Sequence, residues 1–230
     1  METDFIYWRH PTPPGIKVEE ISGGEDKSGD LWRRMALQVY CENGKEGYRE
    51  INHFPSGAPY IEGATERISI SHTNGLLVVA TLPSTPEAHL AEFNERTAMG
   101  IDAERADRRQ VIGLRERFLS AAELEMAEAD SIEANITAWT CKEALYKAAL
   151  TPGLDFRADI RIHVLPRPAD PSTWAERMKD HRSTVSDGYG EASVRFPDGT
   201  TVSMRLYSYR SEDCIVTLAY SPKAATFRKS

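Results

Sequence analysis

The chain has 230 residues, of which 40% are hydrophobic and 27% charged, a balance typical of a folded globular protein. Its length fits one large domain or two halves of about 115 residues each. The formal net charge of −7 argues against broad nucleic-acid binding, which depends on a positive surface field. The longest aliphatic run, residues 76–80, is far shorter than the ~18 apolar residues of a membrane span, so no membrane partner is expected.

Cysteine usage and the first residues predict a cytoplasmic protein. Cys41, Cys141 and Cys214 are odd in number and too widely spaced for a zinc knuckle or a redox Cys-x-x-Cys pair. The chain opens with acidic residues and lacks the basic start and apolar run of a secretory signal. Both observations favour a reduced, cytosolic compartment.

The first half of the chain predicts one helix and one strand pair. Proline and glycine interrupt the first thirty residues, and Asp30 can cap a helix over residues 31–40. Residues 68–71 alternate between apolar and polar side chains, and residues 76–81 have the composition of a buried strand. The Asn-Gly turn between these two segments predicts a hairpin.

The second half predicts a strand, two helices and a series of further strands. Residues 97–102 form the first strand, and Ser120 and Glu123 have the spacing of a capping box at a helix start. Residues 135–150 are rich in helix formers, and Pro152 ends that helix. Four more strands are expected over residues 160–165, 191–196, 201–209 and 214–220. Residues 174–181 form either a short helix or an irregular excursion. The strands that end the two halves resemble each other, which suggests a duplicated unit or chance similarity.

Asp102 and Glu104 lie two residues apart at the end of a predicted strand. Side chains at this spacing point to the same side of a strand. Paired carboxylates suit a hard cation such as Mg²⁺, which prefers oxygen ligands and often shares them with phosphates. An exposed acidic strand end fits the same pattern.

Trp139, Glu143 and Lys147 recur every four residues and therefore share one face of the long predicted helix. A tryptophan on this face indicates partial burial, and a buried Glu and Lys need partners. A metal ion and a phosphate would serve, one for each. An ordinary surface salt bridge between Glu143 and Lys147 also fits.

Two further segments have side chains that suit ligand or partner binding. Residues 69–73 place three hydroxyls and an imidazole at a turn, which suits either a phosphate seat or a satisfied polar turn. Residues 105–117 hold five arginines against two acids, a local charge of +3. This segment is either a docking surface for an acidic partner or a solvated helix face.

The order and spacing of these motifs carry a family resemblance. In chain order the motifs are Gly57-Ala58-Pro59, Ser69-Ile-Ser-His-Thr73, Gly100-Ile-Asp-Ala-Glu104, Arg117-Phe118 and Trp139-Thr-Cys-Lys-Glu-Ala-Leu-Tyr-Lys147. This series resembles the 4′-phosphopantetheinyl transferase superfamily, and most closely its longer, surfactin-synthetase-activating type. The resemblance implies an α+β fold of two pseudo-symmetric halves, each a small antiparallel sheet packed on a long helix. Residues 1–96 would hold the coenzyme A nucleotide, and residues 97–230 the metal site.

The resemblance also implies a metal centre. Asp102, Glu104 and Glu143 would ligate Mg²⁺ together with the pyrophosphate of coenzyme A. Lys147 would contact that pyrophosphate, and Lys142 would lie close by. Glu143, Lys147 and Asp102 would be the catalytic residues, with Glu143 as the base that accepts the serine proton.

Nucleotide-binding residues follow from the same resemblance. Ser71 and His72 would bind the nucleotide phosphates, with His72 on the 3′-phosphate. Arg33 and Arg34 fall on the helix where the family places basic nucleotide-binding residues. Ala58 stands where the family often has Lys or Arg, so that contact is either missing or supplied by Arg33, Arg34 or Lys27.

The implied activity is Mg²⁺-dependent transfer of 4′-phosphopantetheine from coenzyme A to a serine of an apo carrier protein, with release of 3′,5′-ADP. The acidic carrier would dock on four arginines and three neighbouring apolar residues: Arg105, Arg108, Arg109 and Arg115, with Val111, Ile112 and Leu114. A monomer is expected, because the second half would supply the interface that shorter relatives obtain from a neighbour. Two alternatives remain open: a Mg²⁺-dependent phosphodiesterase or pyrophosphatase, and a non-catalytic coenzyme A-binding module.

Overall fold

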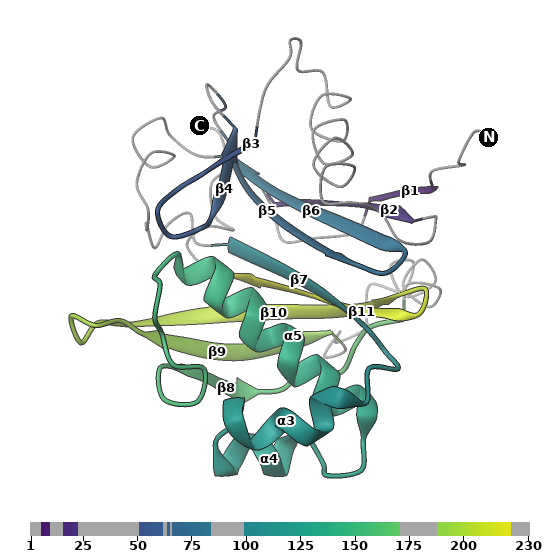
Figure 1. Ribbon diagram of the computed structural model, residues 1–230, viewed down its shortest axis with the longest axis vertical. Coiled ribbons are helices and arrows are strands. Elements are labelled where there is room, and N and C mark those ends of the chain that lie inside the picture. The colour runs from purple at the N-terminus through teal and green to yellow at the C-terminus, as the bar shows by residue number, and fades with distance from the viewer. Residues whose placement is uncertain are drawn as a thin grey trace, which may run out of the picture.

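The computed structural model describes residues 6–9, 16–22, 51–61, 64, 66–83, 99–170 and 188–221 (Figure 1). Several predictions lie outside these residues: the helix over residues 31–40 with Arg33 and Arg34, Lys27, Cys41, and the helix over residues 174–181. None of the helices in the described ranges has the length and apolar content needed to cross a membrane.

The N-terminal sheet has four antiparallel strands in the order β1-β2-β6-β5. Their bounds are β1 Ile6–Arg9, β2 Lys17–Ser22, β5 Glu66–Thr73 and β6 Leu76–Pro83. The predicted hairpin of β5 and β6 is confirmed, and Gly75 at its turn has φ +86, a conformation that side chains disfavour. A separate small hairpin pairs β3 Ile51–His53 with β4 Pro59–Ile61.

The second sheet has five strands in the order β7-β11-β10-β9-β8. Their bounds are β7 Met99–Arg105, β8 Ile160–Val164, β9 Tyr189–Arg195, β10 Thr201–Ser211 and β11 Cys214–Tyr220. All five strands were expected from the sequence. Strand β7 runs further than the prediction, so Asp102 and Glu104 lie within it, paired with Thr217 and Ile215 of β11.

Three helices follow β7 in the chain: α3 Gln110–Phe118, α4 Ala121–Met126 and α5 Ile132–Ala149. The predicted capping box of Ser120 and Glu123 is present at the start of α4. Helix α5 confirms the long predicted helix and ends at Leu150, whose φ of 52 is left-handed, before Pro152.

The five-stranded sheet is covered on both faces. Helix α5 packs across β7 and β11, with Leu145 in the same core as Leu206 and Ile215 (Figure 1). On the other face, Ile101 and Ala103 of β7 share a core with residues of the N-terminal sheet. This burial places Ala103 on the side of β7 opposite to Asp102 and Glu104.

Serine hydroxyls join the two sheets where their edge strands meet. Ser69 Oγ of β5 accepts the amide of Ile101 at 3.0 Å, and Ser71 Oγ accepts the amide of Ala103 at 3.2 Å. The amides of an edge strand need such partners when they are buried. The fold is a mixed α/β structure with antiparallel sheets, and its division into symmetric halves at residue 96 stays a prediction.

Candidate active site

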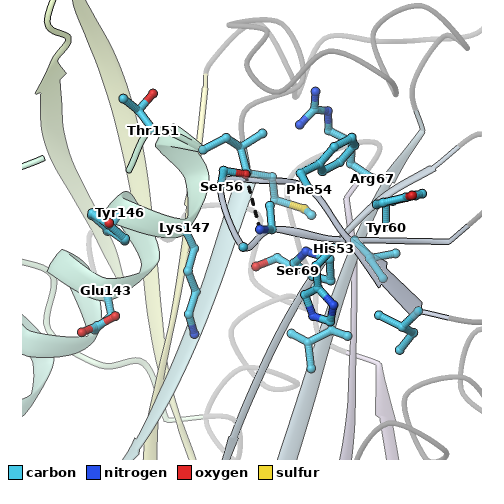
Figure 2. Close-up of a pocket in the computed structure, with 18 of the residues that line it drawn as sticks. His53, Phe54, Ser56, Tyr60, Arg67, Ser69, Glu143, Tyr146, Lys147 and Thr151 are labelled. Carbon is cyan, nitrogen blue, oxygen red and sulfur yellow. Dashed lines mark hydrogen bonds between the residues drawn. The ribbon is translucent and has the colours of Figure 1, made fainter. Parts of the chain in front are cut away.

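Two adjoining cavities lie where β5, β7 and α5 meet. The smaller has a volume of about 310 Å³ and the larger about 510 Å³, and both are lined by Ile70, His72, Glu143 and Lys147. Asp102, Glu104, Arg108 and Trp139 complete much of the smaller one. Figure 2 shows the larger cavity between α5 and the β3–β4 hairpin. The predicted helix face of Trp139, Glu143 and Lys147 is confirmed, because all three line the smaller cavity.

Gly100 allows α5 to lie directly on β7. A Cβ atom at this position would lie 2.2 Å from the carbonyl oxygen of Ala144 and 2.5 Å from the amide nitrogen of Ala148. Any side chain would therefore push the helix away from the strand. Asp102 follows two positions later on the same side of β7, so this close contact brings its carboxylate to Lys147 of α5.

Asp102 links strand β5 and helix α5 in the smaller cavity. Its Oδ1 accepts hydrogen bonds from Lys147 Nζ at 2.7 Å and Ser71 Oγ at 2.9 Å, and the residue is 7% exposed. Lys147 Nζ also donates to the carbonyl oxygen of Ile101 at 3.1 Å. Burial raises the pKa of Asp102, although the charge and hydrogen bond of Lys147 oppose that shift.

The bonds of Ser71 change the interpretation of the predicted phosphate seat. Its buried hydroxyl accepts from the Ala103 amide and donates to Asp102, so it positions that carboxylate. Ser71 also lines the smaller cavity, and its assignment to a nucleotide phosphate stays a prediction. His72, the next residue, lines both cavities, and burial together with the Lys147 charge lowers its pKa. Its role as a phosphate contact stays a prediction.

Glu104 and Glu143 supply two more carboxylates to the smaller cavity. Glu104 forms an ion pair with Arg108 and accepts the amide of Arg105 at 2.9 Å. Burial raises the pKa of Glu143, and the negative charges of Asp102 and Glu104 raise it further. All three carboxylates line the smaller cavity.

The donor chemistry of this cavity fits magnesium, because Asp102, Glu104 and Glu143 offer only oxygen atoms. Among the described residues, however, no three Asp, Glu, His or Cys side chains are arranged to hold one ion. Asp102 is turned to Lys147 and Glu104 to Arg108. The three carboxylates would have to leave these cations to share an ion, so the ligand set stays a prediction.

Lys142 does not lie in this site, which corrects a prediction. Its side chain is 0% exposed, and Nζ donates to Glu123 Oε1 at 2.7 Å and to the carbonyl oxygens of Phe156 at 2.7 Å and Ile160 at 2.6 Å. All three ammonium protons are thus used inside the protein, on a side of α5 away from Lys147. The lysine ties α5 to α4 and β8.

Glu123 is the residue that sequence reasoning recognised only as a helix cap. Besides Lys142, its carboxylate accepts the amides of Ser120 and Ile162, each at 2.7 Å. Burial pushes the pKa of Glu123 upward, but these hydrogen bonds outweigh it and the pKa lies below the ordinary value. Glu123 therefore joins α4 to α5 and β8. Its partners Lys142 and Ile162 are distant in the sequence, so residue spacing alone could not reveal this role.

The larger cavity combines aromatic rings with a buried cation. Phe54 and Tyr60 lie with ring centroids 4.6 Å apart on either side of a tight turn, in which the Ala58 amide donates to Ser56 Oγ at 3.4 Å (Figure 2). Arg67, at the start of β5, lines this cavity and is 8% exposed. Burial lowers the pKa of Arg67 to about 10. Reasoning from the sequence missed this arginine, because it belongs to no motif.

The basic segment is only partly available as a surface. Arg105 pairs with Asp107, Arg108 pairs with Glu104, and Val111 lies in the core at 3% exposed. Val111 therefore cannot help a partner to dock, which corrects that prediction. Arg109 and Leu114 are exposed.

Comparison with known proteins gives one family match that overlaps the residues of this site. Residues 98–194 match the sequence model of the 4′-phosphopantetheinyl transferase superfamily. The matched segment begins just before β7 and includes Asp102, Glu104, Glu143 and Lys147. A search of curated proteins finds no match. The match points to phosphopantetheine transfer, for which the family uses coenzyme A as donor, and leaves the two-half type as a prediction.

Proposed function

We propose that this protein transfers 4′-phosphopantetheine from coenzyme A to a serine of an apo carrier protein. The observation that carries the proposal is the contact of Lys147 with Asp102 at 2.7 Å, at the junction of the two cavities and inside the matched segment. A cation and three carboxylates beside a cavity with aromatic walls suit a nucleotide with a pyrophosphate.

Coenzyme A would lie with its nucleotide in the larger cavity and its pyrophosphate at Lys147. The ammonium of Lys147 donates two of its three protons to Asp102 and Ile101 among the described residues, and its side chain is 30% exposed. The third proton can reach a phosphate oxygen. The positive charge then stabilises the negative charge that develops during transfer.

Asp102, Glu104 and Glu143 are the residues that would hold Mg²⁺, as the family resemblance implies. When bound, this ion would neutralise pyrophosphate charge and orient the phosphoryl group. For the chain itself, this requires Glu104 to leave Arg108 and Asp102 to share its oxygens between Lys147 and the ion. Ser71 would keep Asp102 in place throughout.

Glu143 is the proposed general base. Its raised pKa makes its carboxylate a better proton acceptor than an exposed glutamate. The serine oxygen of the carrier forms a bond to the β-phosphorus, and the bond from that phosphorus to the bridging pyrophosphate oxygen breaks. The serine proton passes to Glu143, and 3′,5′-ADP leaves with the bridging oxygen.

The carrier protein would dock on the exposed side of α3. Arg109 lies at the start of this helix and Leu114 is 40% exposed on it. Arg115 donates to the carbonyl oxygen of Ala129 and keeps its charge near this surface. Arg105 and Arg108 would contribute less, because each already faces an acidic side chain.

Intact-protein mass spectrometry tests the proposal directly. An apo acyl carrier protein incubated with this protein, coenzyme A and Mg²⁺ should gain one phosphopantetheine group. EDTA and the E143Q variant should each abolish the gain, while E125Q, at an exposed position on α4, should not. Cleavage of coenzyme A without a carrier would instead indicate a hydrolase. Full turnover by E143Q with unchanged coenzyme A affinity would refute both roles of Glu143.

A further inference from the structure

A row of polar side chains crosses three strands of the five-stranded sheet, on the face that α5 covers. Asp102 of β7 pairs with Thr217 of β11, and Thr217 pairs with Ser208 of β10. Side chains at directly paired positions lie on the same face of a sheet. The neighbours of Thr217 on this face are Ile215 and Ala219, which belong to the apolar core beneath α5. The polar row therefore interrupts an otherwise apolar contact.

The hydroxyl groups of this row form a hydrogen-bonded chain that ends on α5. Thr217 Oγ1 lies 2.8 Å from Thr140 Oγ1 of α5 and 2.6 Å from Ser208 Oγ, and all three residues are 0% exposed. Thr140 donates its one hydroxyl proton to the carbonyl oxygen of Thr137 at 3.0 Å. Thr217 therefore donates to Thr140, and Ser208 donates to Thr217. Each bond of the chain has a fixed direction, toward α5.

Thr140 shares a side of α5 with the two functional groups of that helix. Glu143 follows it by three positions and Lys147 by seven, spacings that return to the same side of a helix. Lys147 bonds to Asp102 at 2.7 Å, so α5 is attached to the polar row at two points, roughly two helical turns apart. Glu143 lies between these two points and lines both cavities.

The close contact between α5 and β7 involves small residues. Gly100 of the strand faces Ala144 and Ala148 of the helix. Such residues set the distance between the two elements but interlock little, so they oppose a rotation of the helix only weakly. A hydrogen bond between side chains requires a defined distance and angle. Its net contribution to stability is small, so the main effect of the chain of hydroxyls is on geometry.

We infer that Thr217 is a positioning residue, which acts through Thr140 to set the rotation of α5 and thereby aims Glu143 into the smaller cavity. This inference rests on the proposed function, which makes Glu143 the base of the transfer reaction. The described residues that line the two cavities do not include Thr140, Thr217 or Ser208. Thr217 therefore acts through the helix and touches neither coenzyme A nor the carrier serine.

Steady-state kinetics of the transfer reaction test this role with variants that keep the shape of the side chain. T217V should lower kcat about 10-fold and leave the KM for coenzyme A within about twofold of wild type, because a small displacement of a catalytic group slows the chemical step. T217S keeps the hydroxyl and should regain most of the lost kcat. T137V is the matched control and should keep the wild-type kcat. Thr137 is also 0% exposed, but its hydroxyl donates to the carbonyl oxygen of Glu133 in the same helix, at 2.8 Å.

A double-variant cycle identifies the bond that is responsible. T140V should match T217V, and T140V/T217V should lose no more kcat than either variant alone, because both substitutions remove the same hydrogen bond. Thermal unfolding confirms that each variant is folded, and T140V with its rescue T140S decides if T217V is not.

Three outcomes would overturn the inference while leaving the proposed function in place: a wild-type kcat in T217V, an equal loss in T137V, or losses that multiply in the double variant. A wild-type protein that is folded but transfers no phosphopantetheine would overturn the proposed function and, with it, the role of Thr217.

Discussion

Replacing Lys142 by methionine separates the role that the family resemblance implied from the role that the structure shows. The fully buried ammonium donates three hydrogen bonds, so K142M leaves the Glu123 carboxylate and the carbonyls of Phe156 and Ile160 without that donor. Breaking a buried ion pair from one side costs about 3–5 kcal/mol, because the remaining charge is desolvated and unpaired. For a chain of this size, such a loss lowers Tm by roughly 6–20 °C.

Urea unfolding followed by circular dichroism measures this loss. K17M, at an exposed position on β2, is the matched control and should change the free energy of unfolding by less than ~0.5 kcal/mol. At temperatures where K142M is folded, its KM for coenzyme A should stay within about twofold of wild type, since Lys142 does not touch the cavities. A stability loss below ~1 kcal/mol together with a tenfold weaker coenzyme A affinity would refute the structural role and restore the phosphate contact.

Three further predictions concern the strand contact, pH and docking. G100A should destabilise the protein by about 1–3 kcal/mol in urea unfolding and lower transfer activity, because its Cβ meets the backbone of α5; an equally stable variant would contradict that contact. The lowered pKa of Glu123 adds stability above its ordinary pKa, and that stability is lost as pH falls through the lower folded value. Tm should therefore fall more steeply between pH 5 and 3 in wild type than in E123Q, and parallel curves would refute this. R109E should raise the KM for carrier protein about 3- to 10-fold and leave that for coenzyme A unchanged; equal changes in both would exclude docking at Arg109.

Local signals explain why most elements could be predicted. The Asn-Gly turn between β5 and β6, the capping box at Ser120 and the helix-forming composition of α5 each act within a few residues of chain. Such preferences are present in the unfolded chain and survive in the fold when tertiary contacts agree with them. Strand β7 was expected to be shorter because its last residues are polar, and pairing with β11 extended it.

Periodicity predicted part of the site. Trp139, Glu143 and Lys147 share a helix face by spacing alone, and this face does line the smaller cavity. The same spacing cannot say what lies opposite. The Lys147 contact with Asp102 depends on Gly100, whose missing side chain lets α5 reach the strand.

The sequence by itself determined the β5–β6 hairpin, helices α4 and α5, and the helix face that carries Glu143 and Lys147, because these follow from residue types and spacing along the chain. Strands β1 to β4 and helix α3 were not predicted. Only the tertiary structure decided that Lys142 is buried against Glu123, that Ser71 positions Asp102, and that Arg67 enters the larger cavity. These three facts depend on groups brought together from distant parts of the chain. A side chain's partner is set by the packing of whole elements, and desolvation then decides which charges must be paired inside the protein.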